Sequence, residues 1–542
     1  MHKPFAARLI RQPIAFDPGP AAEIASQFAD LAPDLRGLLS ATAGCSPYLQ
    51  DLMRAEADWL RPALHEAPET AFATLIDDLA AVPIDDLGRA LRQAKRRAAL
   101  LTALADLGGV WPTLQVTAAL TTLADRAVSL CLQGLVAEEI RRGKLPGAAP
   151  DDATTAGGMF ALAMGKMGAG ELNYSSDIDL ICLFDQDRYG ADWQEARAAF
   201  IRVTRKMTAL LSDTMAGGYV FRTDLRLRPD ASVTPVCLSM AAAEAYYEAE
   251  GRTWERAAYI KARPCGGDLE AGNRFLKSLT PFVWRKHLDF AAIQDAHDMR
   301  LRIREHRGLN GRLTVEGHNM KLGQGGIREI EFFTQTRQLI AGGRDESLRD
   351  RTTLGGLQRL AEQGWVPEEI AQELSEHYIA HREVEHRIQM VHDAQTHIVP
   401  TTQEGMDRLA RMMGEDIRFH SDLYPERRLV FLGKTAVYSA GATFMSFFAT
   451  ENRYLTRGTR LMIHERLITK NIHLEGPLST CIATLKASLH EIEASIAIQN
   501  EGFANLILGS QVTMEEVLQR APENWYLEAN EAAALGLVAT VL

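Results

Sequence analysis

The sequence predicts a predominantly helical α+β protein, in which helical domains flank one compact α/β unit and a partial α/β module follows. Three observations predict this fold. Long stretches place apolar residues at helical spacing, short apolar runs alternate with glycine-rich turns between residues 157 and 229, and no aspartate occurs from residue 423 to 542. A chain of 542 residues is too long for one typical domain. We expect four domains, at residues 1–150, 151–267, 268–420 and 421–542.

The first domain is predicted to be a helical bundle. Leu100, Leu104 and Leu107 recur at helical spacing, and a pair of glycines then ends that helix. A second helix is expected from Thr117 to Arg142, before a breaker segment rich in glycine and proline.

The second domain is predicted to alternate strands with one helix. MFALAMG is a short apolar run typical of a buried strand, and SSDIDLICLF begins with period-two alternation. A helix is expected over residues 192–216, and YVFRTDLRLRP then predicts a third strand ending at Pro229. Strand, turn, strand, helix and strand form a compact α/β unit.

Two aspartates in the second strand are the strongest candidates for chemistry. Asp177 and Asp179 are two residues apart, so both side chains leave the same face of a strand, whereas Ile178 and Leu180 point into the core. Adjacent carboxylates repel each other unless a cation lies between them. Oxygen ligands of this kind suit Mg²⁺, which binds one or two carboxylates together with substrate phosphates.

The third predicted strand carries a further carboxylate beside two arginines. Asp224, Arg226 and Arg228 are expected on one strand face, where Asp224 completes a metal site and the arginines hold phosphate oxygens. Three carboxylates with a basic flank are suited to in-line displacement at phosphorus.

Other residues are candidates for binding phosphate, each with a structural alternative. Gly165, Gly168 and Gly170 let backbone amides approach a phosphate, although a simple turn explains them equally well. Arg328 follows a glycine-rich turn at a helix start, which favours anions, or it belongs to a capping and salt-bridge cluster. Lys261 is either a point charge near phosphates or a surface lysine.

Composition limits the remaining classes of function. The net charge of −11 argues against a general nucleic-acid-binding surface. Six scattered cysteines without a C-x-x-C pair indicate reduced thiols. Because no signal-peptide-like stretch or run of 18 apolar residues occurs, we expect a cytoplasmic protein without a membrane span.

A histidine-rich segment offers a second metal hypothesis. His377 and His381 are four residues apart and would share a helix face, but no H-E-x-x-H motif accompanies them. We predict instead that this helix packs Val384, Ile388 and Val391 inward and keeps its charges outside.

Several motifs together resemble a known family. GKMGAGELNYSSDIDL followed by RTDLRLRP resembles the signature of the glutamine synthetase adenylyltransferase family, a branch of the nucleotidyltransferases. RTWERAAYIKARP, FVWRKHLDF, NMKLGQGGIREIEFF and VEHRIQMVHDAQTHIVP also resemble it, over residues of about 35–415. The resemblance implies a nucleotidyltransferase-type α/β catalytic domain, with Asp177, Asp179 and Asp224 as catalytic ligands of Mg²⁺. The residues implied to bind phosphate or nucleotide are Gly165, Lys166, Gly168, Ser175, Ser176, Arg226, Arg228, Lys261 and Arg328.

RTDLRLRP is similar to the version in the N-terminal half of these proteins, which removes AMP from a tyrosine of glutamine synthetase. The resemblance therefore implies Mg²⁺-dependent phosphorolysis, in which phosphate attacks the adenylylated tyrosine and ADP leaves. It also implies a role in control of nitrogen metabolism, with glutamine synthetase as protein substrate, phosphate, ADP and ATP as small ligands, and PII signalling protein as a regulator. A catalytically weak protein that only binds glutamine synthetase is the alternative.

The last domain carries a different resemblance. VFLGKTAVYSAGATFMSFF, LMIHER and YLEANEAAALGLVATVL resemble a fragment of the Clp protease proteolytic subunit family, over residues of about 425–542. Ser439 and His464 keep that family's spacing of nucleophile and base. The third member falls near Arg520 or Asn524, and no aspartate is present to orient the histidine. We therefore expect a vestigial module, with a serine peptidase as the alternative.

Overall fold

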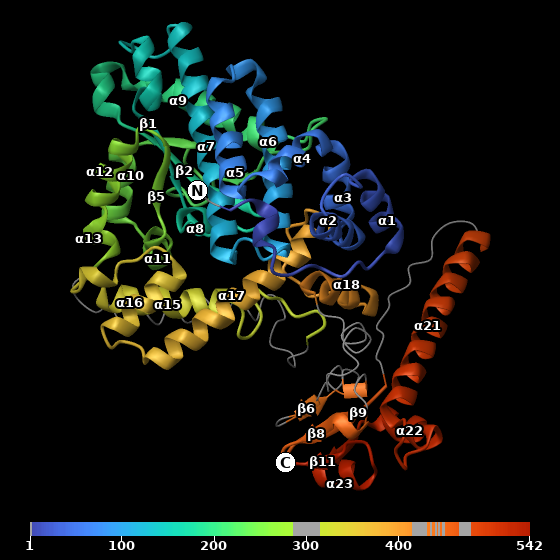
Figure 1. The fold of residues 1–542 in the computed structure, drawn as a ribbon. Coiled ribbons are helices and arrows are strands. Elements are labelled where there is room, and N and C mark those ends of the chain that lie inside the picture. Colours follow the sequence, from blue (N-terminus) through green and yellow to red (C-terminus); the bar gives the residue numbers. More distant parts are fainter. Residues whose placement is uncertain are drawn as a thin grey trace. The chain divides into compact units, whose positions relative to one another are not determined.

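The computed structural model describes residues 3–285, 315–414 and most of 431–542, except 434–435, 439–441, 443–444, 447–449 and 466–477. The chain divides into two compact units, Met1–Glu415 and Asp416–Leu542 (Figure 1). No helix in these described ranges is both long enough and apolar enough to cross a membrane.

The larger unit begins with helices, as the sequence predicts. They are α1 (Pro18–Gln27), α2 (Pro33–Cys45), α3 (Pro47–Ala55), α4 (Ala57–His65), α5 (Pro68–Asp78), α6 (Ile84–Leu107) and α7 (Thr113–Arg141). Helix α6 ends before Gly109, whose φ of 65° lies in the left-handed region that glycine adopts without strain. The predicted helix ends at the paired glycines and near Arg142 are confirmed.

A mixed five-stranded sheet lies at the centre of this unit. Its strands are β1 (Met159–Ala163), β2 (Asp177–Phe184), β3 (Arg222–Asp224), β4 (Cys237–Ser239) and β5 (Arg263–Gly267). β2 pairs antiparallel with β1 and parallel with both β3 and β4, and β1 pairs antiparallel with β5. The first two predicted strands are therefore confirmed.

Ten further α-helices lie in the described part of this unit. They are α8 (Gly165–Gly168), α9 (Trp193–Ser212), α10 (Met240–Ala249), α11 (Thr253–Ile260), α12 (Leu269–Ser278), α13 (Thr280–Val283), α15 (Ile327–Ala341), α16 (Thr353–Glu362), α17 (Glu368–Met390) and α18 (Gln403–Met413).

The two faces of the sheet are buried against different helices. Ile178 and Leu180 of β2 are fully buried in the core that contains α6, α7 and α9. Ile181 and Leu183, which alternate with them, pack against α10 and α12 instead. Because the first core also contains residues of α1 to α7, the N-terminal helices and the central sheet share one hydrophobic core.

The third predicted strand is shorter than expected. β3 ends at Asp224, where the carboxylate accepts the backbone N–H of Arg226 at 2.8 Å and turns the chain. The prediction that Asp224, Arg226 and Arg228 share one strand face is therefore wrong.

The smaller unit has its own core and contains helices and strands. The strands are β6 (Phe431–Gly433), β7 (Ala436–Tyr438), β8 (Arg453–Leu455), β9 (Arg460–Ile463), β10 (Trp525–Glu528) and β11 (Thr540–Val541), in the orders β10-β9-β7 and β11-β8-β6. The helices are α21 (Leu478–Ile507), α22 (Met514–Arg520) and α23 (Ala529–Ala534). Helix α21 carries exposed apolar side chains, namely Ile482, Leu485, Leu489, Ile492 and Ile496. The resemblance to a Clp fragment stays a prediction, and Ser439 lies outside the described residues.

Candidate active site

The three predicted carboxylates meet at one end of the sheet. In the parallel pairing of β2 with β3, Asp177 lies opposite Arg222 and Asp179 lies opposite Asp224. One oxygen from each of Asp177, Asp179 and Asp224 lies within 4.8 Å of the other two. Among the described residues, this is the cluster of acidic, cysteine or histidine side chains with the geometry to hold a metal ion.

The electrostatics of this cluster suit a divalent cation. Burial, followed by the charges of Asp177 and Asp224, raises the pKa of Asp179 to about 6, and Lys321 and Arg328 only partly offset this rise. Three half-buried oxygen donors that repel one another match the ligand chemistry of Mg²⁺. The residues present therefore fit the predicted metal.

Asp224 differs from Asp179 because it already has a partner. Hydrogen bonds from Arg226 lower the pKa of Asp224, and Nε of Arg226 donates to its carboxylate at 2.8 Å. Arg228 lies further along the turn, where its guanidinium donates to the backbone carbonyls of Leu225, Ala231, Thr234 and Pro235. Arg226 thus pairs with one carboxylate of the cluster, Asp224, whereas Arg228 holds the shape of the loop.

The glycine-rich turn packs directly against the carboxylates. Gly165 adopts a φ of 53°, and a Cβ there would lie 2.9 Å from an oxygen of Asp179. A Cβ on Gly168 would lie 2.2 Å from the carbonyl oxygen of Lys261. Both positions therefore require glycine for close approach, which supports the turn-forming alternative and leaves phosphate binding a prediction.

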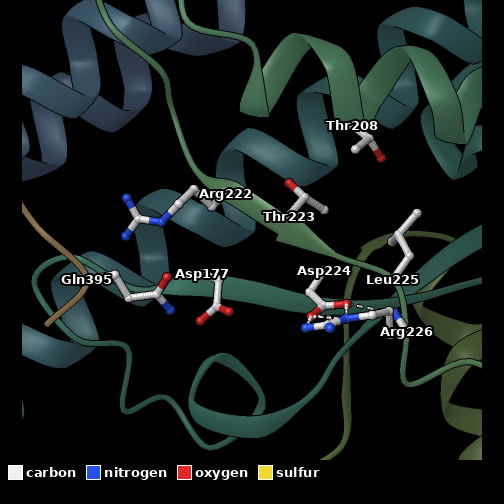
Figure 2. A pocket seen from close by; sticks show the side chains of 8 residues that line it. All are labelled: Asp177, Thr208, Arg222, Thr223, Asp224, Leu225, Arg226 and Gln395. Carbon is white, nitrogen blue, oxygen red and sulfur yellow. Dashed lines mark hydrogen bonds and ion pairs between the residues drawn. The ribbon is translucent and has the colours of Figure 1, made fainter. Parts of the chain in front are cut away.

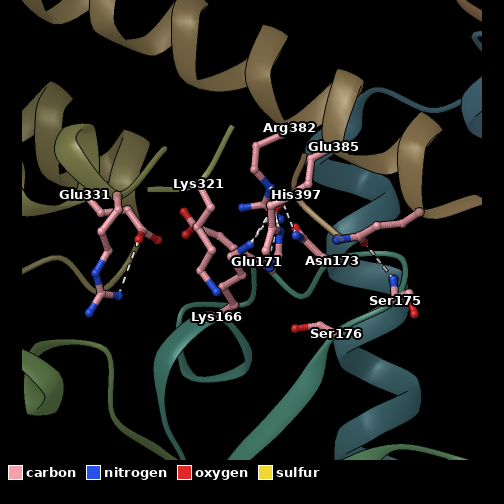
Figure 3. A network of polar contacts seen from close by, with 12 residues as sticks. Lys166, Glu171, Asn173, Ser175, Ser176, Lys321, Glu331, Arg382, Glu385 and His397 are labelled. Carbon is pink, nitrogen blue, oxygen red and sulfur yellow. Dashed lines mark hydrogen bonds and ion pairs between the residues drawn. The ribbon is translucent and has the colours of Figure 1, made fainter. Parts of the chain in front are cut away.

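The same turn is tied to helix α17 by buried ionic contacts (Figure 3). Nζ of Lys166 lies 3.3 Å from the carboxylate of Glu385, and burial lowers the pKa of Lys166 to about 7 despite that pairing. Glu385 also accepts from Asn173 and contacts His397, and it lies 3.7 Å from Arg382. Although burial alone would raise it, these partners hold the pKa of Glu385 well below its usual range.

The prediction that α17 keeps its charges outside is wrong. Arg382, Glu385, His386 and Arg387 are all at most 1% exposed. Asp106 of α6 explains why two of these side chains can be buried, because its carboxylate lies 2.7 Å from Arg387 and 3.1 Å from His386. The helix therefore packs by buried ion pairs as well as by apolar contacts.

The two serines before the aspartates have different surroundings. The backbone N–H of Ser175 donates to the side chain of Gln389 at 2.9 Å, and its hydroxyl donates to the carbonyl of Asp393 at 3.0 Å. Ser176 is less buried, and its hydroxyl lies 3.5 Å from the carboxylate of Asp177. Ser175 is thus anchored to the segment after α17, whereas Ser176 lies beside the carboxylates.

Two further predicted cations lie near the start of helix α15. Lys261 is buried and pairs with Glu331 at 2.7 Å, so the alternative that it is a surface lysine is wrong. Arg328 has 58% of its side chain exposed and lies 3.9 Å from Glu331. Its backbone N–H donates to the carbonyl of Lys321 at 2.9 Å, which brings a second cation to this junction.

A pocket of about 470 Å³ adjoins the carboxylates (Figure 2). Asp177 and Asp224 line it, together with Arg222 of β3, Thr208 of α9 and Gln395. The sequence predictions missed Arg222, Gln395 and Lys321. Period-two alternation from Asp224 places Arg222 on the same strand face, but no local pattern marks the other two.

Two of the residues singled out in the smaller unit have local partners. His464 follows β9, and its Nδ1 lies 2.5 Å from the carbonyl oxygen of Glu465. Arg520 lies near the position expected for the third peptidase residue. It pairs with Glu516 of its own helix at 3.1 Å.

Comparisons with known proteins agree with the geometry of the larger unit. Residues 37–278 match the family model described as glutamate-ammonia ligase adenylyltransferase, and residues 297–435 match the model described as GlnD PII-uridylyltransferase. Two relatives are named bifunctional glutamine synthetase adenylyltransferase/adenylyl-removing enzyme. The protein from Rhodopseudomonas palustris strain CGA009 is 49% identical over 447 residues, which are 78% of this chain and 45% of the relative. The protein from Bradyrhizobium sp. strain BTAi1 is 52% identical over 396 residues, which are 72% of this chain and 40% of the relative.

The chain thus spans less than half the length of these curated relatives. The matched segments include the three carboxylates, the glycine-rich turn and the sheet that carries them. Through its larger unit, the chain belongs to the glutamine synthetase adenylyltransferase family.

Proposed function

We propose that this protein removes AMP from an adenylylated tyrosine of glutamine synthetase by Mg²⁺-dependent phosphorolysis and releases ADP. The observation that carries the proposal is the cluster of Asp177, Asp179 and Asp224 beside a glycine-rich turn. The names of the relatives include both attachment and removal of the adenylyl group. RTDLRLRP, which resembles the adenylyl-removing version, favours removal.

The reaction balances without another co-reactant. A bond forms between an oxygen of hydrogen phosphate and the α-phosphorus, and the bond from that phosphorus to the tyrosine oxygen breaks. The proton carried by the phosphate ends on the tyrosine oxygen, so the products are ADP and an unmodified tyrosine. A bound Mg²⁺ would neutralise charge on the phosphoryl oxygens.

The protein groups divide this work between them. Asp177, Asp179 and Asp224 would hold the metal, and Gly165 allows the turn to approach Asp179 closely. Arg328, exposed near Asp179, is placed to attract the incoming phosphate. We assign the nucleotide side to the turn that contains Lys166 and Gly168 and to the serines that follow it. Arg226 would act beside Asp224, whereas Arg228 and Lys261 would support the site through the backbone and ionic contacts described above.

The proposal also covers the protein's location in the cell and its regulator. We propose a cytoplasmic location, where glutamine synthetase and ATP are available. PII signalling protein is the proposed regulator. The support for PII is the match of residues 297–435 to a model described as a PII-uridylyltransferase.

The direct test supplies adenylylated glutamine synthetase, phosphate and Mg²⁺ and measures ADP by chromatography. We expect ADP release that depends on both phosphate and Mg²⁺. In the reverse assay, with ATP and unmodified glutamine synthetase, mass spectrometry should detect little transfer of AMP. Rapid tyrosine adenylylation would reverse the assignment, and tight binding without turnover would favour the binding-protein alternative.

A further inference from the structure

Cations lie on both sides of the carboxylate cluster. On the pocket side, Arg226 is paired with Asp224, and the guanidinium of Arg222 donates to Tyr219 and Ser175. On the other side, the charges of Lys321 and Arg328 act on Asp179, and 58% of the Arg328 side chain is exposed. These two cations come from one junction, since their backbones are hydrogen-bonded to each other. Gly165 approaches the same carboxylate. The side of the cluster at Asp179 therefore presents the exposed guanidinium of Arg328 to an incoming anion, whereas Arg226 on the pocket side is paired with Asp224.

The other side of the cluster opens into the pocket of about 470 Å³. Asp177 and Asp224 line this pocket, and Figure 2 shows Arg222 and Gln395 beyond Asp177. The side chain of Arg226 is 84% exposed at its edge, and Gln395 is also exposed. The pocket is thus accessible from solvent, and its volume lies within the range of about 300–1,000 Å³ that is usual for ligand pockets.

In-line displacement separates the two oxygens that exchange on phosphorus. The attacking and leaving oxygens lie on opposite sides of the phosphorus atom. In the proposed reaction the attacking group is a phosphate dianion, which the cations Lys321 and Arg328 attract. The leaving tyrosine then lies on the opposite side, toward Asp177 and Asp224.

We propose that this pocket receives the tyrosine-bearing segment of the protein substrate. The proposal rests on the phosphorolysis proposed above and assigns the acceptor side of that same site. A tyrosine on a protein surface needs an entrance open to solvent, which the exposed rim provides. The bond that breaks joins phosphorus to the tyrosine oxygen, and the phosphate's proton passes to that oxygen.

Arg222 is the group that would act on the leaving tyrosine. Its guanidinium donates to the hydroxyls of Tyr219 and Ser175, so its position is fixed. Its Nε–H is buried and has no hydrogen-bond partner in the described part of the chain. A fixed positive charge stabilises the negative charge that develops on a departing phenolate oxygen.

Two residues that line the pocket are suited to contacts with peptide groups. Gln395 makes no hydrogen bond to another described residue, so its amide is free to donate and accept. The hydroxyl of Thr208 donates to the carbonyl of Thr204 at 3.0 Å and keeps its own acceptor capacity. Substitutions here change the pocket without changing the metal ligands.

The experiment compares Thr208→Phe, which fills the pocket, with Ala209→Phe, which adds the same ring to the exposed side of α9. For each full-length variant, KM is measured for adenylylated glutamine synthetase and for phosphate, and affinity is measured for Mg·ADP. We expect Thr208→Phe to raise the KM for modified glutamine synthetase at least 10-fold. The KM for phosphate and the affinity for Mg·ADP should stay within 2-fold, and Ala209→Phe should match wild type in all three measurements.

Gln395→Ala provides a second pocket variant. It leaves helix α9 unchanged, because Gln395 lies outside that helix. It should raise the KM for the protein substrate 3- to 10-fold without changing Mg·ADP affinity. Equal loss of Mg·ADP affinity in both pocket variants would overturn the proposal and make the pocket a nucleoside site. Direct binding of modified glutamine synthetase separates the two proposals: if wild type binds it but releases no ADP, the phosphorolysis fails. In that case unchanged binding by Thr208→Phe would overturn the pocket assignment, and selectively lost binding would support it.

Discussion

The carboxylate of Glu385 lies 3.3 Å from Nζ of Lys166, although the two residues are 219 positions apart. This contact joins α17 to the glycine-rich turn that packs on Asp179. Because Asn173 also donates to Glu385, both the beginning and the end of the segment before β2 are held by one side chain. The position of the turn relative to the carboxylates thus depends on a helix from a distant part of the chain.

Glu385→Gln tests that dependence. The substitution removes the charge opposite Lys166, and breaking a buried ion pair by removing one partner costs about 3–5 kcal/mol of unfolding free energy. We expect a clear loss of stability in denaturant unfolding and a lower rate of ADP release. Glu376→Gln, at an exposed position on the same helix, is the matched control.

Adding Lys166→Met to Glu385→Gln should recover part of the lost stability, because the buried ammonium group of Lys166 is then no longer left without its carboxylate. If the double variant were less stable than Glu385→Gln alone, the two residues would not act as a pair.

Removing two metal ligands should abolish activity but keep the fold. For the Asp177→Asn/Asp179→Asn variant we expect at least a 1,000-fold lower rate of phosphate-dependent ADP release, because the metal can no longer bridge protein and phosphate. Wild type treated with a chelator should show the same loss, and added Mg²⁺ should restore it. Circular dichroism checks the fold, and wild-type rates in the variant with Mg²⁺ present would show that the carboxylates do not bind the metal.

Asp179→Asn should stabilise the metal-free protein near pH 7. The folded-state pKa of Asp179 is raised from 3.8 to about 6, so folding favours its protonated form. The free energy of unfolding therefore falls as pH rises from about 4 to 6, by at most about 3 kcal/mol. In Asp179→Asn the side chain does not ionise, so the free energy of unfolding does not fall in this way. The variant should therefore melt at a higher temperature than wild type at pH 7.

The stability advantage should disappear at pH 4, where wild-type Asp179 is protonated, and at saturating Mg²⁺, which stabilises only the wild-type site. Asp58→Asn, an exposed substitution in the same unit, should show no such pH dependence. Equal melting temperatures for wild type and Asp179→Asn at pH 7 without metal would contradict the electrostatic picture of the cluster.

The smaller unit should contribute nothing to catalysis. A chain that ends at Glu415 should keep phosphate-dependent ADP release, because the carboxylates and the pocket all belong to the larger unit. It should also be more soluble, since truncation removes the exposed apolar side chains of α21.

In the full-length chain, Ser439 should not react with a fluorophosphonate probe. A serine hydroxyl is a poor nucleophile until a positioned base removes its proton, and the module contains no aspartate to orient His464. Stoichiometric labelling that His464→Ala abolishes would instead identify an active peptidase.

Sequence reasoning succeeded where the information is local. Period-two alternation predicted that Asp177 and Asp179 share a face and that Ile178 and Leu180 are buried, and β2 confirms both. The pattern predicted a strand around Asp224 but overestimated its length, because the Asx turn that ends β3 depends on how Asp224 and Arg226 bond to each other.

The sequence by itself therefore determined the helices, the first two strands and the carboxylates of the candidate site. Only the tertiary structure decided which charges are buried. Arg387 resembles a solvent-facing residue of an amphipathic helix until Asp106 of α6 is brought within 2.7 Å of it. Lys261 likewise has no local feature that predicts burial beside Glu331. The physical reason is that burying a charge is unfavourable unless an opposite charge compensates it, and here the compensating partners come from distant parts of the chain.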